Sequence, residues 1–195
     1  MIYECVDPRE LKIDIREMSA RLGTPVGVLP KDAEEIIESV LCAAKPAYVA
    51  VHAKISRQND RIFVENIATD SRALFEVCRE SDECILVVAT LGVGVDRLIL
   101  RTSSISPYDS FVADAVADAL IEALCDHAEE KLAAGLVTRG RFSPGYADLE
   151  LSFGKEIIRL TDAERLLGIK QSDSGLMIPK KSVNAIIAIR KNENG

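Results

Sequence analysis

The segment from Arg139 to Tyr146 carries side chains well suited to hold a small anion. Arg141 offers a planar guanidinium whose paired N–H donors match a carboxylate or a phosphate. The loop-forming residues Ser143-Pro144-Gly145-Tyr146 follow, which is typical of a stiff turn that would fix the phenol relative to the guanidinium. We therefore expect Arg141 either to grip a small molecule or to tie a surface loop to Asp148 or Glu150.

A row of carboxylates forms a second candidate site. Asp114, Asp118, Glu122 and Asp126, which we call the acidic row, recur every four residues and so share one face of a helix. Like charges at this spacing cost about 0.2–0.5 kcal/mol for each neighbouring pair. The acidic row is either a solvated face opposite an apolar stripe, or a surface that docks a basic partner or accepts hydrogen bonds from a polar ligand.

Other residue combinations disfavour several common chemistries. Leu91 to Arg97 contains two glycines, but Arg97 stands where a dinucleotide-binding fingerprint has its third glycine, so we expect the glycines to ease a tight turn. No phosphate-binding loop of the type G-x-x-x-x-G-K-[ST] occurs. His52 and His127 have no partners at metal-binding spacing, and no metal site is expected. The five cysteines form no C-x-x-C pair and are expected to be reduced and mostly packed.

Helices and strands must position these residues. Ser106, Pro107 and Asp109 form a helix start, and the apolar spacing that follows predicts one helix to about Ala134, roughly 40 Å long. The residues after Gly135 are irregular and are expected to form a loop as far as Tyr146. Because no regular β-α-β alternation occurs, the pattern favours an α+β fold. The other predicted elements are helices at 14–22, 32–41, 71–78, 93–100 and 161–167 and strands at 47–55, 61–65, 84–89 and 182–189. Asp14, Asp32 and Thr161 are predicted to cap the first, second and last of these helices.

Composition predicts a single globular domain over residues 1–195. The chain has 24 Lys and Arg against 31 Asp and Glu, which gives a net charge of −7. This acidic surplus disfavours nucleic-acid binding, which depends on neutralising phosphates. The N-terminal residues lack the pattern of a signal peptide, and the longest apolar run, 85–95, is too short to cross a bilayer. We therefore expect a cytoplasmic location and no membrane association.

Residues 141–146, Arg-Phe-Ser-Pro-Gly-Tyr, resemble the R-x-x-x-G-Y signature of the S-adenosylmethionine-binding activation (reactivation) domain of cobalamin-dependent methionine synthase. The order of features is also similar to that family. A long helix precedes the signature, a helix that ends at Gly168 follows it, and Pro179 stands shortly before a strand that begins with Ser182 and Val183. The likeness is best from Ile85 to Ile189, and the length fits a stand-alone short form of this domain.

The resemblance implies a C-shaped α+β domain with a curved antiparallel sheet, which binds S-adenosylmethionine in an extended, shallow site. It implies that Arg141 clamps the methionyl carboxylate, that Ser143 contacts the ligand through its backbone, and that Tyr146 closes a binding segment that includes Pro144 and Gly145. The implied function is to support the reductive methylation that reactivates the cobalamin of a separate methionine synthase. Cobalamin would enter only through that partner, and a flavodoxin-type protein would supply the electron.

Two departures from the family pattern support an alternative. Gly135 stands where the family can have an acidic ligand contact, and the chain ends soon after its last strand, so aromatic contacts beyond it are missing. In the alternative, the chain is a non-catalytic partner protein that has lost ligand binding and docks a corrinoid protein through the acidic row. A third interpretation, a corrinoid-binding methyltransferase subunit, would require a D-x-H-x-x-G loop, which the sequence lacks.

Overall fold

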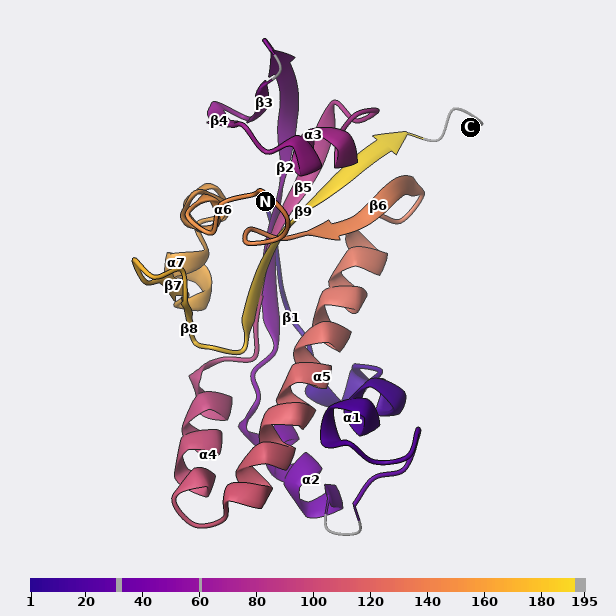
Figure 1. Cartoon of the computed structure of the whole chain (residues 1–195), viewed down its shortest axis with the longest axis vertical. Coiled ribbons are helices and arrows are strands. Elements are labelled where there is room, and N and C mark those ends of the chain that lie inside the picture. Colours follow the sequence, from indigo (N-terminus) through magenta and orange to yellow (C-terminus); the bar gives the residue numbers. More distant parts are fainter. Residues whose placement is uncertain (31–32, 60, 192–195) are drawn as a thin grey trace.

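An antiparallel sheet runs through the middle of the molecule, with helices on both faces (Figure 1). The computed structural model describes residues 1–30, 33–59 and 61–191. The strands follow the order β4-β3-β2-β5-β9-β6, and β1 pairs with the start of β2. The strands of this sheet are β1 (Ile2–Cys5), β2 (Ala47–Gln58), β3 (Arg61–Val64), β4 (Ile67–Thr69), β5 (Glu83–Thr90), β6 (Leu136–Phe142) and β9 (Ser182–Lys191), while β7 (Lys170–Gln171) and β8 (Met177–Ile178) pair separately.

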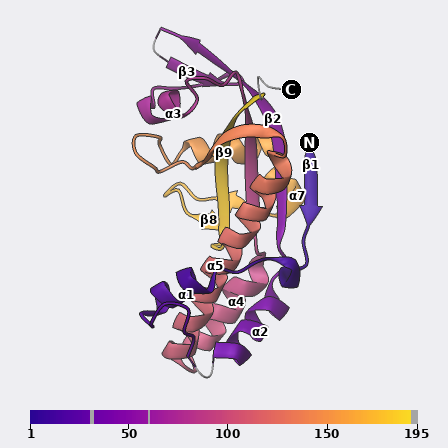
Figure 2. The ribbon, with the colours of Figure 1, turned by 90° about the vertical axis from the view of Figure 1, so that its right-hand side faces the viewer.

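Two groups of helices cover the two faces of the sheet. α5 packs on one face with α1, α2 and α4 around it, and α3, α6 and α7 pack on the other (Figures 1 and 2). This arrangement confirms the predicted α+β class with an antiparallel sheet flanked by helices. The helices are α1 (Ile15–Leu22), α2 (Ala33–Ala43), α3 (Arg72–Val77), α4 (Val93–Ser103), α5 (Pro107–Leu132), α6 (Phe153–Thr161) and α7 (Ala163–Leu167), with a 3-10 turn η1 (Pro8–Glu10).

The two cores follow from the alternation of side chains along each strand. In β5, Ile85 and Val87 pack toward α5, whereas Leu86 and Val88 pack toward α6 and α7. Because both faces are covered, β5 is buried on both sides, as predicted. β2 was expected to be half-buried throughout, but residues 47–50 are buried on both faces, and exposed positions begin only at His52.

Side chains cap three of the helix starts, as the sequence predicted for Asp14 and Ser106 but not for Ser71. Asp14, Ser71 and Ser106 cap α1, α3 and α5 by accepting backbone N–H bonds at 2.7, 3.1 and 3.2 Å. Gly23 ends α1 in the left-handed region, with φ of 67°. The predicted cap of the second helix, Asp32, lies outside the described residues.

Three elements near the candidate segment differ from the prediction. Residues 136–142, expected as a loop, form β6, because β9 supplies ladder partners for their backbone groups. α6 was not predicted, and its start is weakly marked because Ser152 makes no side-chain capping bond. Thr161, expected to cap the next helix, is instead the last residue of α6 and donates to the Ile157 carbonyl at 2.7 Å. β1 was also missed.

α5 is the longest helix and is enclosed on more sides than the sequence indicated. Its 26 residues extend about 39 Å. Ala113, Ala117 and Ile121 are buried in addition to the predicted stripe, because α1, α2 and α4 pack around the helix away from the sheet. Tyr108 and Phe111, which the apolar spacing after Ser106 also includes, are 48% and 52% exposed and lie in the first turns of α5, next to the loop that joins it to α4.

Gly92 and Gly94 serve the start of α4, as predicted. Gly92 precedes the helix with φ of 78°, in the region that favours glycine. A Cβ at Gly94 would lie 2.3 Å from the carbonyl oxygen of Ala43, so the missing side chain lets α4 approach the end of α2.

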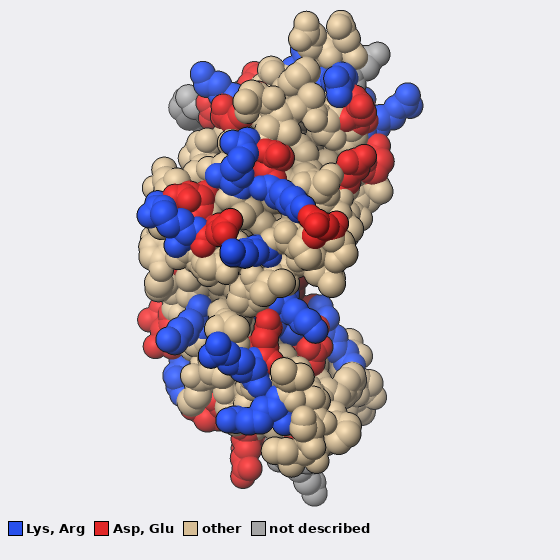
Figure 3. Space-filling model, turned by 90° about the vertical axis from the view of Figure 1, so that its left-hand side faces the viewer, with Lys and Arg blue, Asp and Glu red and all other residues tan. Residues whose placement is uncertain are grey.

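The outline of the molecule is hollowed on one edge at mid-height (Figure 3). This notch gives the C-shaped outline that the resemblance implied. On the face shown in Figure 3, basic and acidic side chains mix, so the net negative charge is not concentrated there.

Candidate functional site

A β-bulge in β6 separates the two arginines of the candidate segment. Thr138 pairs with Ile189 and Arg141 pairs with Ile187, so Arg139 and Gly140 together occupy the space of one residue. Gly140 permits this with φ of 80°. In consequence Arg139 forms an ion pair with Glu80 at 3.3 Å, whereas Arg141 extends toward α5.

Arg141 lies among three carboxylates of α5. Its Nη2 is 3.0 Å from Glu122, and its Nη1 is 2.7 Å from Asp126 and 3.2 Å from Glu129. We call these four residues the Arg141 cluster. Arg141 and Glu129 are only 20% and 22% exposed, so water screens their contact less than a surface ion pair. Burial lowers the pKa of Arg141, but the hydrogen bond to Asp126 and the neighbouring negative charges outweigh it, and the pKa is raised.

The residues after Arg141 form the tight turn that the sequence predicted. The Tyr146 N–H donates to the Ser143 carbonyl at 3.2 Å, and the Gly145 N–H donates to the Leu149 carbonyl at 2.7 Å. Gly145 has φ of 92°, and Pro144 is buried while Ser143 is half-buried. Tyr146 is 68% exposed, so the turn presents its phenol to solvent.

Two contacts anchor this turn to the rest of the fold. Leu151 packs over Gly145 and Gly175. A Cβ added at Gly145 would lie 2.7 Å from the Leu151 side chain, and one added at Gly175 would lie 3.1 Å from it. Asp148 accepts hydrogen bonds from Ser71 and from the first residues of α3. The expectation that Arg141 ties the loop to Asp148 or Glu150 was therefore wrong, because both carboxylates have other partners and Arg141 reaches α5.

Every member of the acidic row has a cationic partner within the chain. Lys181 lies 2.8 Å from Asp114 and 2.6 Å from Asp118, and Arg21 lies 2.9 Å from Asp118. Glu122 and Asp126 contact Arg141. The structure thus brings the predicted ligand-binding arginine together with half of the predicted docking residues.

Sequence reasoning missed Glu129 and Lys181. Glu129 is three residues after Asp126. Residues three apart on a helix are neighbours, as residues four apart are, but the acidic row was identified by the spacing of four alone. Lys181 directly precedes β9, and it contacts α5 only because β9 pairs with β5 on the sheet that α5 covers. No local pattern marks that contact.

The histidines and cysteines show no arrangement for catalysis or metal binding. Cys78, Cys84 and Cys125 are buried, and Cys5 and Cys42 are exposed free thiols. His127 lies 3.5 Å from Glu4, which also accepts a hydrogen bond from Tyr48 at 2.6 Å. Within residues 1–30, 33–59 and 61–191, no three His, Cys, Asp or Glu side chains gather as a metal site would require. Of the helices described, none has the length and hydropathy needed to cross a bilayer.

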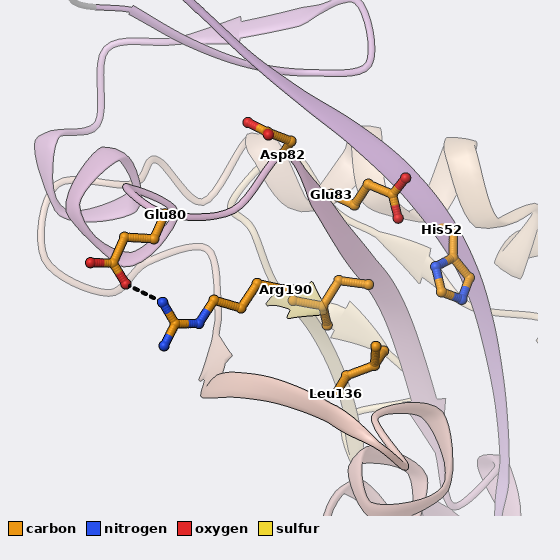
Figure 4. Close-up of a pocket in the computed structure, with 7 residues that line it drawn as sticks. His52, Glu80, Asp82, Glu83, Leu136 and Arg190 are labelled. Atoms are coloured by element: carbon orange, nitrogen blue, oxygen red, sulfur yellow. Dashed lines mark hydrogen bonds and ion pairs between the residues drawn. The ribbon is translucent and has the colours of Figure 1, made fainter. Parts of the chain in front are cut away.

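A hollow of about 390 Å³ is lined by residues of β2, β5, β6 and β9 and of the loop before β5 (Figure 4). Leu136 and Ile189 give it apolar surface, and His52 and Glu83 stand on neighbouring strands at one side. Arg190 pairs with Glu80 at 2.9 Å on the other side. None of the predicted site residues lines this hollow, so it is separate from the Arg141 cluster.

Comparisons with known proteins identify the fold. Neither a protein-family model nor a curated protein sequence matches this chain. Among solved structures, the MetH reactivation domain bound to AdoHcy is similar over 96% of this chain and 77% of that chain, with a TM-score of 0.73 and 18% sequence identity. At this identity the likeness shows the fold alone. The chain has the α+β fold of the MetH reactivation domain.

Proposed function

We propose that this chain is a binding module for S-adenosylmethionine. The observation that carries the proposal is the position of Arg141, held by α5 at the base of the Ser143–Tyr146 turn, in a fold that it shares with a domain solved with AdoHcy. A methionyl group carries one carboxylate and one ammonium. The guanidinium of Arg141 matches the first, and the carboxylates around it match the second.

The hydrogen bonding of Arg141 leaves donors for such a ligand. Its bonds to the described residues start from Nη1 and Nη2, and its Nε–H donates to none of them. A ligand carboxylate can therefore add to the Arg141 cluster, or displace the most exposed partner, Asp126, whose side chain is 73% exposed. The exposed turn beside it would leave the bound ligand open to a second protein.

We further propose that the methyl donor held here serves the reactivation of the cobalamin of a separate methionine synthase. Support comes from the R-x-x-x-G-Y sequence at residues 141–146 and from the shared fold. The cobalamin would stay with the partner and accept the methyl group. This chain would bind the donor, orient it and present it at the surface turn.

The alternative, docking of a corrinoid protein through the acidic row without a small ligand, has less support. Lys181 and Arg21 neutralise Asp114 and Asp118, and Arg141 contacts the other two carboxylates. Half of the row is therefore neutralised within the chain, and Glu122 and Asp126, which share one guanidinium, lie where the small ligand is proposed to bind.

Isothermal titration with S-adenosylmethionine tests the binding proposal. We expect saturable heat with the wild type and a loss of at least tenfold in affinity for Arg141→Ala. Arg139→Ala is the matched control, because Arg139 is two residues away but contacts Glu80. Absence of heat at millimolar ligand, or equal affinity in both variants, would overturn the proposal.

A reactivation assay tests the partner. A methionine synthase without its own activation domain, with its cobalamin oxidised, would be mixed with this chain, a reductant and S-adenosylmethionine. We expect activity to recover with the wild-type chain and to recover much less with Arg141→Ala. Recovery that is unchanged when this chain is omitted would contradict the assignment.

A further inference from the structure

We infer that the Arg141 cluster selects its ligand by charge, so that the site prefers the sulfonium of S-adenosylmethionine to the neutral thioether of S-adenosylhomocysteine. This inference rests on the proposed function and adds a specificity to it. It assigns the main selective role to Glu129, which the sequence motif does not include.

The charges around Arg141 do not balance. Glu122, Asp126 and Glu129 face one guanidinium, so the cluster holds two more negative than positive charges. Arg139 does not compensate them, because the bulge in β6 directs it to Glu80. Besides its contact with Arg141, the Glu129 side chain accepts only one weak hydrogen bond from the described residues, from the Thr138 hydroxyl at 3.5 Å.

The excess of negative charge is larger beside Arg141 than in the first half of the acidic row. Nearer the start of α5, Asp114 and Asp118 contact two cations, Lys181 and Arg21. Arg21 also pairs with Glu17, so this group has an excess of one negative charge rather than two. Lys181 is 11% exposed, so that part of the acidic row is neutralised inside the fold. The larger uncompensated charge therefore lies beside Arg141, where the ligand is proposed to bind.

S-adenosylmethionine and S-adenosylhomocysteine differ in net charge. Both carry a carboxylate and an ammonium, which leaves S-adenosylhomocysteine neutral overall and S-adenosylmethionine with one positive charge on sulfur. A ligand carboxylate that binds Arg141 draws the guanidinium away from its carboxylate partners. The ammonium can replace it at one of them. Because the ligand carboxylate and ammonium cancel, the cluster keeps its excess of two negative charges with S-adenosylhomocysteine, and the sulfonium reduces that excess to one.

Glu129 is the carboxylate best placed to make this distinction. Its side chain is 22% exposed, against 40% for Glu122 and 73% for Asp126, so its field is the least screened of the three. When the methyl group passes to a nucleophile of a partner, the S–C electron pair stays on sulfur and the positive charge of the ligand disappears. The product is then held less tightly, which favours its release.

The test is titration with three ligands of different charge: S-adenosylmethionine, S-adenosylhomocysteine and sinefungin, whose protonated amine replaces the sulfonium. We expect the wild type to bind both cationic ligands at least about fivefold more tightly than S-adenosylhomocysteine at low salt. In Glu129→Gln this ratio should fall toward one, mainly through weaker binding of the cationic ligands. Glu130→Gln is the matched control, because Glu130 is the adjacent exposed residue of α5 and has no ion pair among the described residues.

The outcomes separate the inference from the proposed function. Equal affinities for the three ligands in the wild type, or the same ratio in Glu129→Gln and Glu130→Gln, would overturn charge selection while leaving ligand binding intact. If none of the three binds, the proposed function fails and the inference fails with it. Far-ultraviolet circular dichroism checks that each variant is folded, and Glu122→Gln replaces Glu129→Gln if that variant is not.

Discussion

The Asp148 carboxylate accepts a hydrogen bond from the Ser71 hydroxyl at 2.6 Å, although 77 residues separate the two in sequence. The same carboxylate accepts the backbone N–H groups of Arg72 and Ala73 at 2.8 and 3.2 Å, so it caps α3 from the segment that follows the candidate turn. The Ser71 bond is the main reason that the pKa of Asp148 lies below its ordinary value. One side chain thus links the segment that follows the Ser143–Tyr146 turn to α3.

We predict that Asp148→Ala lowers the urea midpoint at pH 7, because α3 loses a cap and the turn loses a tether. Since the pKa of Asp148 is lower in the folded chain than in the unfolded one, its ionised form stabilises the fold above about pH 4. That contribution is lost as the pH falls through the folded-state pKa. Urea unfolding between pH 3 and pH 7 should therefore show a difference between wild type and variant that is constant above about pH 5 and shrinks below pH 4.

The control for this prediction is Glu150→Ala. Among the described residues, the Glu150 side chain accepts a hydrogen bond only from the Ser152 hydroxyl, at 3.0 Å, and its removal should change the midpoint little. An Asp148→Ala variant as stable as Glu150→Ala at pH 7 would show that the link to α3 does not contribute.

Tyr146 should affect ligand binding but not folding. Its side chain is 68% exposed, so Tyr146→Ala should change the free energy of unfolding by no more than about 0.5 kcal/mol. Under the proposed function the phenol closes the binding segment, and the same variant should weaken S-adenosylmethionine severalfold in titration. Tyr108→Ala is the control, since Tyr108 is 48% exposed at the start of α5, about 20 Å along the helix before Glu122, the first residue of α5 that contacts Arg141. Equal affinities for the two variants would remove Tyr146 from the site.

The backbone at Gly145 requires glycine. Its φ of 92° is strained for an L residue, and we predict that Gly145→Ala costs about 1–3 kcal/mol in the free energy of unfolding, measured with urea. Gly140→Ala has a similar φ of 80° but open space around the new Cβ. Because Leu151 is 50% exposed and can rotate away, the two variants should lose similar stability. A much larger loss for Gly145→Ala, relieved by Leu151→Ala, would show instead that Leu151 is fixed.

The sequence predicted the elements with strong local signals and missed those that depend on distant contacts. Ser106 with Pro107 located the start of α5 because capping is a local interaction. β6 was taken for a loop because Gly140 breaks its pattern, and only pairing with β9 makes the segment a strand. α6 was missed because its nine residues lack a capping side chain.

The candidate site was predicted in its parts but not in its arrangement. Arg141 and the acidic row were both identified, yet nothing local in the sequence shows that they meet. Their contact depends on the bulge at Gly140, which reverses the alternation of side chains along β6, and on the position of α5 against the sheet edge. Glu129 becomes part of the cluster only through that geometry.

Thiol reactivity should divide the cysteines into two groups. Cys5 and Cys42 are exposed, whereas burial raises the pKa of Cys78 to about 11 and that of Cys125 to about 12, and also raises the pKa of Cys84. Because the thiolate is the reactive form, we predict that the aromatic disulfide reagent DTNB modifies two thiols in the native protein at pH 8 and all five in guanidinium chloride. Native reactivity that persists in Cys5→Ser with Cys42→Ser would contradict the buried positions.

At Gly94, a glycine-to-alanine substitution should destabilise the fold, although the same substitution normally stabilises a helix. Glycine to alanine inside a helix normally stabilises by about 1 kcal/mol. At Gly94 the new Cβ would lie 2.3 Å from the Ala43 carbonyl oxygen, a backbone atom that cannot move without shifting α2, so we expect a loss of about 1–3 kcal/mol in urea unfolding. Gly154→Ala in α6 is the comparison, because its Cβ would meet the side-chain amides of Gln171 and Asn184 rather than a backbone atom, so we expect a smaller loss there. A stabilised Gly94→Ala variant would mean that α2 and α4 pack less closely than the structure shows.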